Sequence, residues 1–551
     1  MSTDRIFTTH YVRREIALGD MWQVELEDKR SFKLAVPGCI ESVPSMTSYV
    51  GRAVFSKEVM FGGSARLVFR GVSHTARVFL DGRLLGSHYG AYGSFSFVLK
   101  DIPYGRHVIG VETDNSLSGA SALHVSNDYY NYNGITRPVL LEQLNKAYIK
   151  YVHFTPHREN GIWRARLSAS VENVSDTAES LKLRVSIAGT EAEFAETELK
   201  AGESRIISAE AEFADAADYM PSSPVLYEMQ AELMCGGQVI DDLIDRVGFK
   251  EIRVEGRDVY FNDEKIKLKG FNRHEEYAEF GCAVPLAAMC RDIEIIKDTG
   301  ANCVRTCHYP NDERWLDLCD ENGLFVWEEA HARGLSEEQM RNPAFDWQSA
   351  LTTEEMITEH YNHPSIFVWG LLNECASHTE YGRECYKRQI AQIRSLDSSR
   401  PVTYASCHPW KDICLDLVDI VSFNIYPGWY FDEDVAGYLK RVRDWVETTE
   451  GAGKPFIISE TGAGAIYGFR STTKAKWSEE RQADILKEQL TAVMADAECM
   501  GVIIWQYCDC RVDEGWFAVR PKSENNKGVV DIYRREKLAY GTVKAIFSKN
   551  K

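Results

Sequence analysis

Residues 366–374 read IFVWGLLNE, an apolar run that ends in two polar residues, Asn373 and Glu374. A turn-like Asn-His-Pro-Ser precedes it, and its proline disfavours helix for the residue before it. This composition predicts a strand buried on both faces, with the polar pair at its carboxyl end. Residues 455–460, PFIISE, show the same pattern, an apolar run that ends in a polar residue, here Glu460. Two buried strands therefore each end in a glutamate.

Strand-like and helix-like segments alternate from about residue 251 onward. The expected strands are 266–270, 303–306, 324–327, 366–372, 402–405, 420–423, 455–459 and 502–505. Amphipathic segments such as 287–299, 313–322, 381–396 and 478–495 lie between them. Eight β-then-α units predict a (β/α)8 TIM barrel, whose active site lies at the carboxyl ends of the strands. Glu374 and Glu460 fall on the ends of strands four and seven.

The sequence before the barrel predicts β structure only. Short alternating runs separated by Gly, Asp and Pro fill residues 1–145, where Asp81-Gly82 predicts a hairpin turn. This pattern is typical of a jelly-roll β-sandwich. Residues 146–250 hold about seven short strands, as an immunoglobulin-like sandwich does. We therefore expect a jelly-roll domain (1–145), an immunoglobulin-like β-sandwich (146–250) and a catalytic TIM barrel (251–551).

Composition excludes several classes of partner. The chain carries 63 Lys and Arg against 82 Asp and Glu, a net charge of −19. That balance argues against nucleic acid or an anionic membrane as the main partner. The N-terminus has no apolar signal-peptide core, and no run of 18 apolar residues occurs. Fourteen cysteines without zinc-spaced CxxC pairs indicate reduced thiols, so we expect a cytoplasmic protein.

Two carboxylates at one end of a barrel suit glycoside hydrolysis, with one as acid/base and the other as nucleophile or base. A single glutamate at a strand end is about as often merely solvated, but the pair favours catalysis. Other expected strands end in Arg273 and His274, Arg305 and His308, Asn424 and Tyr426, and Trp505 and Tyr507. Such a polar cup with aromatic walls suits a sugar. A non-catalytic carbohydrate-binding protein is the alternative from another class.

Two longer stretches make the chain similar to glycoside hydrolase family 2 over its full length. Residues 302–310, NCVRTCHYP, resemble the strand-two signature of that family, and residues 361–374 resemble its acid/base signature. The resemblance implies a retaining mechanism with Glu374 as acid/base and Glu460 as nucleophile. It also implies that Arg305 keeps the nucleophile ionised and that Asn373 binds the sugar 2-hydroxyl.

Within the family, the β-glucuronidase branch is the most similar. Its mark is an Asn-x-Lys-Gly motif that binds the sugar carboxylate, and Asn525, Lys527 and Gly528 match it. Asp128, in the loop DYYNYNG, resembles the acidic residue that this branch sends from the jelly roll into the barrel mouth. The remaining residues that resemble its pocket are His308, Asn424, Tyr426, Tyr430, Trp505 and Arg520. The resemblance implies an exo-acting β-glucuronidase of bacterial type.

Some positions leave alternatives open. Ile425 and Pro427 stand where many glucuronidases have Arg and Tyr, so a β-galacturonidase or an enzyme accepting both acids remains possible. A β-galactosidase is a further alternative, but it would leave Lys527 without a charge to pair. Glu329-Ala330-His331 matches the spacing of the magnesium motif of family β-galactosidases. It has no evident partner ligands, so we expect no metal and no other cofactor. The expected partners are a small-molecule or oligosaccharide β-hexuronide and other copies of the chain in a homodimer or homotetramer.

Overall fold

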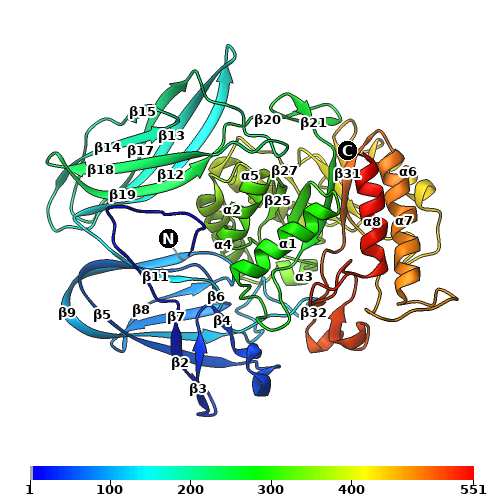
Figure 1. Cartoon of the computed structure of the whole chain (residues 1–551), viewed down its shortest axis with the longest axis horizontal. Coiled ribbons are helices and arrows are strands. Elements are labelled where there is room, and N and C mark those ends of the chain that lie inside the picture. Colours follow the sequence, from blue (N-terminus) through cyan, green and yellow to red (C-terminus); the bar gives the residue numbers. More distant parts are fainter. Residues whose placement is uncertain (1–3, 551) are drawn as a thin grey trace.

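Two β domains lie beside one flank of a barrel that is surrounded by helices (Figure 1). The computed structural model describes residues 4–550. The first β domain and the second lie one above the other in this view, and the N-terminal segment runs between them. This arrangement confirms the fold class predicted from the sequence. Among the described residues, none of the helices has the length and apolar character that crossing a membrane requires.

The barrel is built from parallel strands that are buried along their whole length. In chain order they are β23 (Leu268–Arg273), β24 (Cys303–Thr306), β25 (Phe325–Glu329), β26 (Ile366–Gly370), β27 (Val402–Thr403), β28 (Ala405–Ser406), β29 (Val421–Asn424), β30 (Phe456–Thr461) and β31 (Cys499–Ile504). Each strand pairs with its neighbour in the sequence, and β23 also pairs with β31. β27 and β28 are two pieces of the fifth strand separated by Tyr404, so the barrel consists of eight strand positions.

Helices cover the outside of the barrel. They are α1 (Leu286–Asp298), α2 (Glu313–Asn322), α3 (Glu337–Met340), α4 (Phe345–His360), α5 (Glu380–Leu396), α6 (Val435–Val446), α7 (Glu479–Ala495) and α8 (Leu538–Phe547). Asp312, Thr379 and Ser478 cap α2, α5 and α7 by accepting hydrogen bonds from backbone N–H groups. Each such cap stabilises its helix by about 1 kcal/mol. These three helices therefore begin where the sequence places a short polar residue.

A small sheet closes the amino-terminal end of the barrel. It comprises β20 (Ile252–Glu255), β21 (Asp258–Phe261) and β22 (Glu264–Lys265). Val259 and Phe261 from this sheet pack with Ile457 and Ile503 of the barrel strands in one apolar cluster. Because this end is filled by apolar side chains, the polar strand ends are confined to the opposite face.

The first β domain differs from the sequence prediction in the length of its strands. Its strands are β1 (Glu15–Ala17), β2 (Met21–Leu26), β3 (Ser31–Ala35), β4 (Gly38–Cys39), β5 (Arg52–Phe69), β6 (Val72–Ser73), β7 (Thr75–Leu80), β8 (Arg83–Tyr89), β9 (Phe95–Asp114), β10 (Gly134–Ile135) and β11 (Val139–Gln143). β5 and β9 are much longer than the short runs that we expected in this region. Their pairing shifts register around Gly63, which has φ +80°, so both strands bend there without ending. The predicted Asp81-Gly82 hairpin turn is confirmed between β7 and β8.

The second β domain is a sandwich of two antiparallel sheets. One sheet contains β12 (Ala147–Glu159), β13 (Ile162–Asn173) and β17 (Ser204–Phe213). The other contains β14 (Glu179–Ile187), β15 (Thr190–Glu193), β16 (Thr197–Leu199), β18 (Tyr227–Cys235) and β19 (Gln238–Val247). Alternate apolar side chains of both sheets form a single core, including Trp163, Leu183 and Met229.

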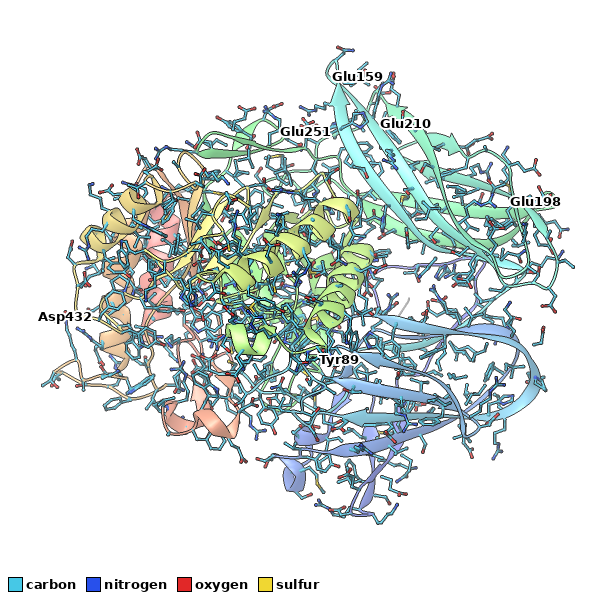
Figure 2. The ribbon with its side chains drawn as sticks, turned by 180° about the vertical axis from the view of Figure 1, so that it is seen from behind. Tyr89, Glu159, Glu198, Glu210, Glu251 and Asp432 are labelled. Atoms are coloured by element: carbon cyan, nitrogen blue, oxygen red, sulfur yellow. The ribbon has the colours of Figure 1, made fainter. Side chains whose placement is uncertain are left out.

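The N-terminal segment connects all three parts of the molecule. Buried Arg13 donates to Asp241 on β19 and to Glu142 on β11, and therefore joins the two β domains. Arg5 donates to Asp317 on barrel helix α2. Tyr89, at the end of β8, packs in the apolar cluster of the barrel, and Figure 2 shows it where the first β domain meets the barrel. The first β domain is thus held in a fixed position against the barrel.

Asp292 on α1 holds the first strand to the C-terminal part of the chain. Its fully buried carboxylate accepts from Arg273 on β23, from Arg534 and from the Tyr507 hydroxyl. Asp292→Ala leaves two buried cations without their partner, so we expect a loss of about 3–5 kcal/mol in the free energy of unfolding. Urea denaturation followed by tryptophan fluorescence measures this loss.

The control is Glu294→Ala on the same helix, which removes an exposed pair with Arg291. That variant should lose about 1 kcal/mol or less. Equal losses in the two variants would contradict the structural role of Asp292.

Candidate functional site

The two glutamates lie at the carboxyl ends of β26 and β30, and the end of β29 contacts both of them. Asn424 donates from Nδ2 to Glu374 Oε1 at 2.9 Å. Tyr426 donates its hydroxyl hydrogen to Glu460 Oε2 at 2.6 Å. Ser459, next to Glu460, donates to Asn424 Oδ1 and so fixes the orientation of this amide. The pair predicted from the sequence therefore belongs to one continuous hydrogen-bonded site.

The chain reaches Glu374 through a strained turn after β26. Leu372 and Glu374 have φ angles of +46° and +54°, a region that costs a residue other than glycine roughly 1–3 kcal/mol. The Glu374 N–H donates to the Ala405 carbonyl on β28 at 2.9 Å, which holds the turn in this conformation. The Glu374 side chain retains 18% of its exposure, whereas Glu460 is almost completely buried. The turn therefore presents Glu374 towards the mouth of the barrel.

Arg305 at the end of β24 connects the predicted residues. Its Nε and Nη2 both donate to Glu329 at 2.9 Å, and its Nη1 donates to Glu460 Oε1 at 2.9 Å. Its remaining N–H groups donate to Asn272 Oδ1 at 2.8 Å and to Asn373 Oδ1 at 2.7 Å. All five N–H groups of this buried guanidinium thus have an acceptor. The Asn373 Nδ2 group is buried and has no partner, so it is available to a ligand.

The pKa of Glu460 differs from the expectation drawn from the sequence. Burial and the nearby charge of Glu374 raise it, Arg305 and the Tyr426 hydroxyl lower it, and the result is about 7. We expected Arg305 to keep Glu460 ionised, but Arg305 also neutralises Glu329 and so offsets only part of the burial. Two carboxylates in one site share protons readily, because ionising both at once is costly.

A second polar group forms at the mouth of the barrel around Asp128. Arg520 donates to Asp128 Oδ2 at 2.7 Å, and Asn525 Nδ2 donates to the same oxygen at 3.0 Å. Burial alone would raise the pKa of Asp128, but Arg333, Arg520 and Lys527 together hold it well below its usual range. Asp128 therefore stays ionised, and a loop of the first β domain completes a site at the barrel face.

Lys527 lies beside this group. It is buried, and its Nζ donates to the Tyr430 hydroxyl at 2.8 Å. Burial lowers the pKa of Lys527, while the nearby Tyr430 and Asp128 oppose that shift. Tyr430 itself is 55% exposed at the barrel mouth and contacts the Tyr426 ring edge-to-face. This contact joins the Lys527 side of the site to the glutamates.

Arg333 is the site residue that sequence reasoning missed. It follows β25 in the bland stretch EEAHARG, and its backbone forms a β-bridge with Asn373. Its Nη2 lies 3.1 Å from Asp128 Oδ1 and 3.6 Å from Glu374 Oε2. Its position at the end of the third barrel strand was the available signal. Arg333 thus links the two halves of the site.

The aromatic wall expected from the sequence is present. Trp505 is buried and stacks on the His308 ring, with ring centroids 5.0 Å apart. His308 Nδ1 lies 3.0 Å from Glu329 Oε1. Both Glu329 oxygens already bind Arg305, and the His331 ring contacts the His124 ring. The Glu329-Ala330-His331 motif is therefore engaged in ion-pair and ring contacts. His331 Nε2 lies 3.2 Å from the Tyr129 hydroxyl.

Comparisons with known proteins agree with this geometry. Residues 147–250 match the model for glycosyl hydrolases family 2, and residues 252–519 match the model for the TIM barrel domain of that family. A solved GH2 β-galacturonidase from Eisenbergiella tayi, bound to galacturonate, is 49% identical, with 99% of each chain covered and a TM-score of 0.97. The chain belongs to glycosyl hydrolases family 2.

Glucuronidases are more distant relatives of this family member. The β-glucuronidase of Streptococcus agalactiae is 27% identical over 515 residues, which cover 86% of this chain and 83% of that protein. The solved β-D-glucuronidase of Dictyoglomus thermophilum is 26% identical, with a TM-score of 0.85 and coverage of 98% and 97%. The family assignment makes the protein a glycoside hydrolase, as the sequence predicted.

The pKa of Glu460 predicts the pH dependence of glycoside hydrolysis. A carboxyl group with a pKa of about 7 is protonated below that pH and cannot attack, so kcat/KM should fall as pH drops through about 7. Tyr426→Phe removes a hydrogen bond that favours the ionised form of Glu460. The fall of kcat/KM on the acid side of the pH profile, its acid limb, should therefore move to higher pH. Tyr430→Phe, whose hydroxyl binds Lys527, should leave the limb in place. An unmoved acid limb in Tyr426→Phe would contradict this assignment.

Arg333→Met tests the residue missed by sequence reasoning. It removes the cation between Asp128 and Glu374, and losing one charged contact lowers kcat/KM by about 10–100-fold. Steady-state kinetics measure this change. The control is Arg341→Met, which removes an exposed pair with Glu337 and should leave the kinetics unchanged. Equal activity of both variants would exclude Arg333 from the site.

Proposed function

We propose that this protein is a retaining, exo-acting β-hexuronidase that releases a terminal hexuronic acid from its aglycone. Glu374 acts as acid/base and protonates the leaving oxygen, and Glu460 attacks the anomeric carbon. The positions of the two groups support these roles. Glu374 lies towards the mouth, where an aglycone leaves, and Glu460 lies deeper, held by Arg305 and Tyr426.

The observation that carries this proposal is the unpaired charge of Lys527. Its ammonium group is buried and forms no ion pair with a carboxylate within residues 4–550. A buried ammonium ion that contacts no carboxylate is unfavourable, and the carboxylate of a hexuronic acid would supply that contact. A neutral galactoside would not, which argues against the β-galactosidase alternative.

Contacts to sugar hydroxyls follow from the remaining polar groups. The buried Nδ2 of Asn373 has no partner and can donate to the 2-hydroxyl, a contact that strengthens in an oxocarbenium-like transition state. Asp128, kept ionised by its cations, can accept from hydroxyl groups at the opposite side of the ring. The aromatic ring of Trp505, stacked on His308, can provide an apolar surface on which a sugar packs.

The identity of the acid at C4 has two candidates. The sequence prediction placed the β-D-glucuronide first, and curated β-glucuronidases are relatives at about 27% identity. The 49% identical relative is described as a β-galacturonidase and was solved with galacturonate. We therefore propose that the enzyme accepts hexuronides with galacturonide as the better substrate, in line with Ile425 and Pro427 in place of Arg and Tyr.

Location and assembly stay predictions. All fourteen cysteines are free, which suits a reducing cytoplasm in a bacterium. We propose a homodimer or homotetramer from family likeness alone.

Hydrolysis of one chromogenic leaving group on three sugars tests the function. We expect turnover of the β-galacturonide and the β-glucuronide, the former faster, and little turnover of the β-galactoside. Lys527→Ala should lose preference for the acids, while Lys522→Ala, an exposed lysine in the same loop, should retain it. Preference for the neutral galactoside would overturn the assignment of Lys527. Unchanged turnover in Glu460→Gln would overturn the mechanism, and no turnover of any of the three sugars would favour the non-catalytic alternative.

A further inference from the structure

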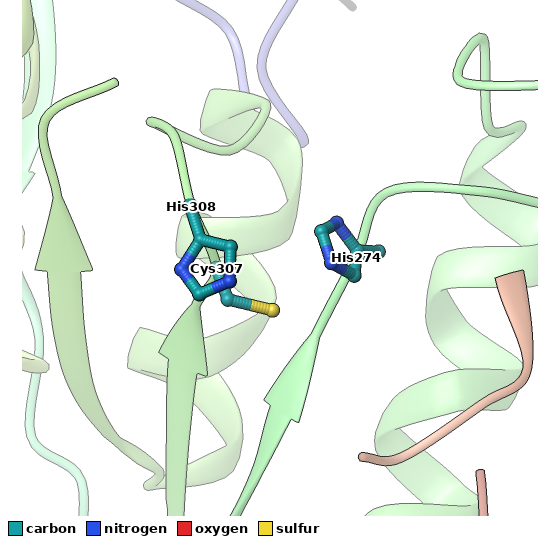
Figure 3. Close-up of side chains that lie close together, drawn as sticks. All are labelled: His274, Cys307 and His308. Atoms are coloured by element: carbon teal, nitrogen blue, oxygen red, sulfur yellow. The ribbon is translucent and has the colours of Figure 1, made fainter. Parts of the chain in front are cut away.

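Three chemically soft ligands meet at the floor of the site. Figure 3 shows His274, at the end of β23, facing Cys307 and His308, which follow β24. One nitrogen of each imidazole and the Cys307 sulfur lie within 4.8 Å of one another, and all three residues are buried. Cys307 has no role in the proposed hydrolysis. The cluster therefore offers a ligand set that the proposed function does not use.

Both histidines have an unsatisfied nitrogen. The Nε2 atoms of His274 and His308 are buried and have no hydrogen-bond partner. Since every N–H of Arg305 has an acceptor, His308 Nδ1 is best placed to donate to Glu329 Oε1, which leaves a lone pair on Nε2. His274 Nδ1 lies 3.1 Å from the Tyr309 hydroxyl. A carboxylate that accepts from the other ring nitrogen, as Glu329 does for His308, is a usual support for a metal-binding histidine.

The nucleophile lies next to this cluster. Glu460 Oε1 is 4.0 Å from His308 Nε2, which is close enough to provide a fourth ligand. Two imidazoles, one thiolate and one carboxylate are a tetrahedral ligand set typical of zinc. Tetrahedral zinc holds its ligands roughly 3.5 Å apart, so the three cluster atoms, which lie within 4.8 Å of one another, would have to move closer by about 1 Å to bind it.

We propose that His274, Cys307 and His308 bind Zn2+ when the sugar site is empty, with Glu460 as the fourth ligand, and that this ion inhibits the enzyme in competition with substrate. The Cys307 thiol releases its proton to solvent as the Zn–S bond forms. The ion binds the Glu460 carboxylate, which must attack the sugar. Metal and substrate therefore cannot bind at the same time. Zinc takes no part in the hydrolysis itself.

In the other group of possible ligands in the described chain, Asp317, Asp320 and His363, both carboxylates already have partners. Asp317 is paired with Arg5, and Asp320 accepts from His363 and from the Ser365 N–H. A cation there would have to displace these partners. The cluster of Figure 3 instead has two open nitrogen positions, Nε2 of His274 and Nε2 of His308.

Cobalt binding tests the site without any substrate. The full-length protein, freed of metals with a chelator, is titrated with Co2+, and the near-ultraviolet thiolate-to-cobalt absorption band is recorded. We expect a band at one equivalent that Cys307→Ser abolishes and that Cys407→Ser retains. Cys407 is a matched control because it lies 3.6 Å from His408 at the barrel mouth. Absence of the band in the native protein, or its persistence in Cys307→Ser, would overturn the metal site.

The inhibition part rests on the proposed function and is measured separately. With a chromogenic hexuronide, Zn2+ should raise KM without lowering kcat, and Cys307→Ser should raise the inhibition constant at least tenfold. Its kcat/KM without zinc should stay within about twofold of the native value, because serine is nearly isosteric with cysteine. Cys307→Ala provides a second variant should the serine destabilise the chain. Inhibition that lowers kcat alone, or that Cys407→Ser removes, would contradict the proposal, whereas a failed hydrolysis assay leaves the cobalt result intact.

Discussion

The site depends on one buried cation, Arg305. Its guanidinium has no exposed surface and binds Glu329, Glu460, Asn272 and Asn373 from four different strands or strand ends. A buried ion is tolerated only when its hydrogen bonds are satisfied, and here every N–H has an acceptor. The same geometry that stabilises the barrel end therefore fixes the nucleophile and the amide that precedes the acid/base.

Glu329 makes this arrangement possible. It accepts two of the five N–H hydrogen bonds of Arg305, so Glu460 receives only one hydrogen bond from the cation. As a result, the pKa of Glu460 is about 7, and Arg305 does not keep this carboxyl group fully ionised near neutral pH. Glu329 also accepts from His308, which leaves Nε2 of that ring free at 4.0 Å from Glu460 Oε1. Glu329 takes no part in the proposed reaction, but it thus affects the pKa of Glu460 and the hydrogen bonding of His308.

The barrel and its paired glutamates were predictable because parallel buried strands have a distinctive apolar pattern and a common polar end. Asp128, Asn525 and Lys527 were predictable from short motifs only through family resemblance. Arg333 was missed because an arginine in a loop has no periodicity that distinguishes it from a solvated one. The bend in β5 escaped prediction because a bulge at Gly63 continues a strand that the sequence pattern interrupts. The pKa of Glu460 depends on burial and charges that only the folded site brings together.

Trapping the covalent intermediate tests the central claim most directly. A hexuronide with fluorine at C2 and a good leaving group forms the glycosyl-enzyme but slows its hydrolysis, since the fluorine destabilises the oxocarbenium-like transition state. Mass spectrometry of the digested protein then identifies the labelled residue. Our account predicts one sugar per chain, attached to Glu460. A label on Glu374, or steady hydrolysis of ordinary hexuronides with no trapped species, would contradict it.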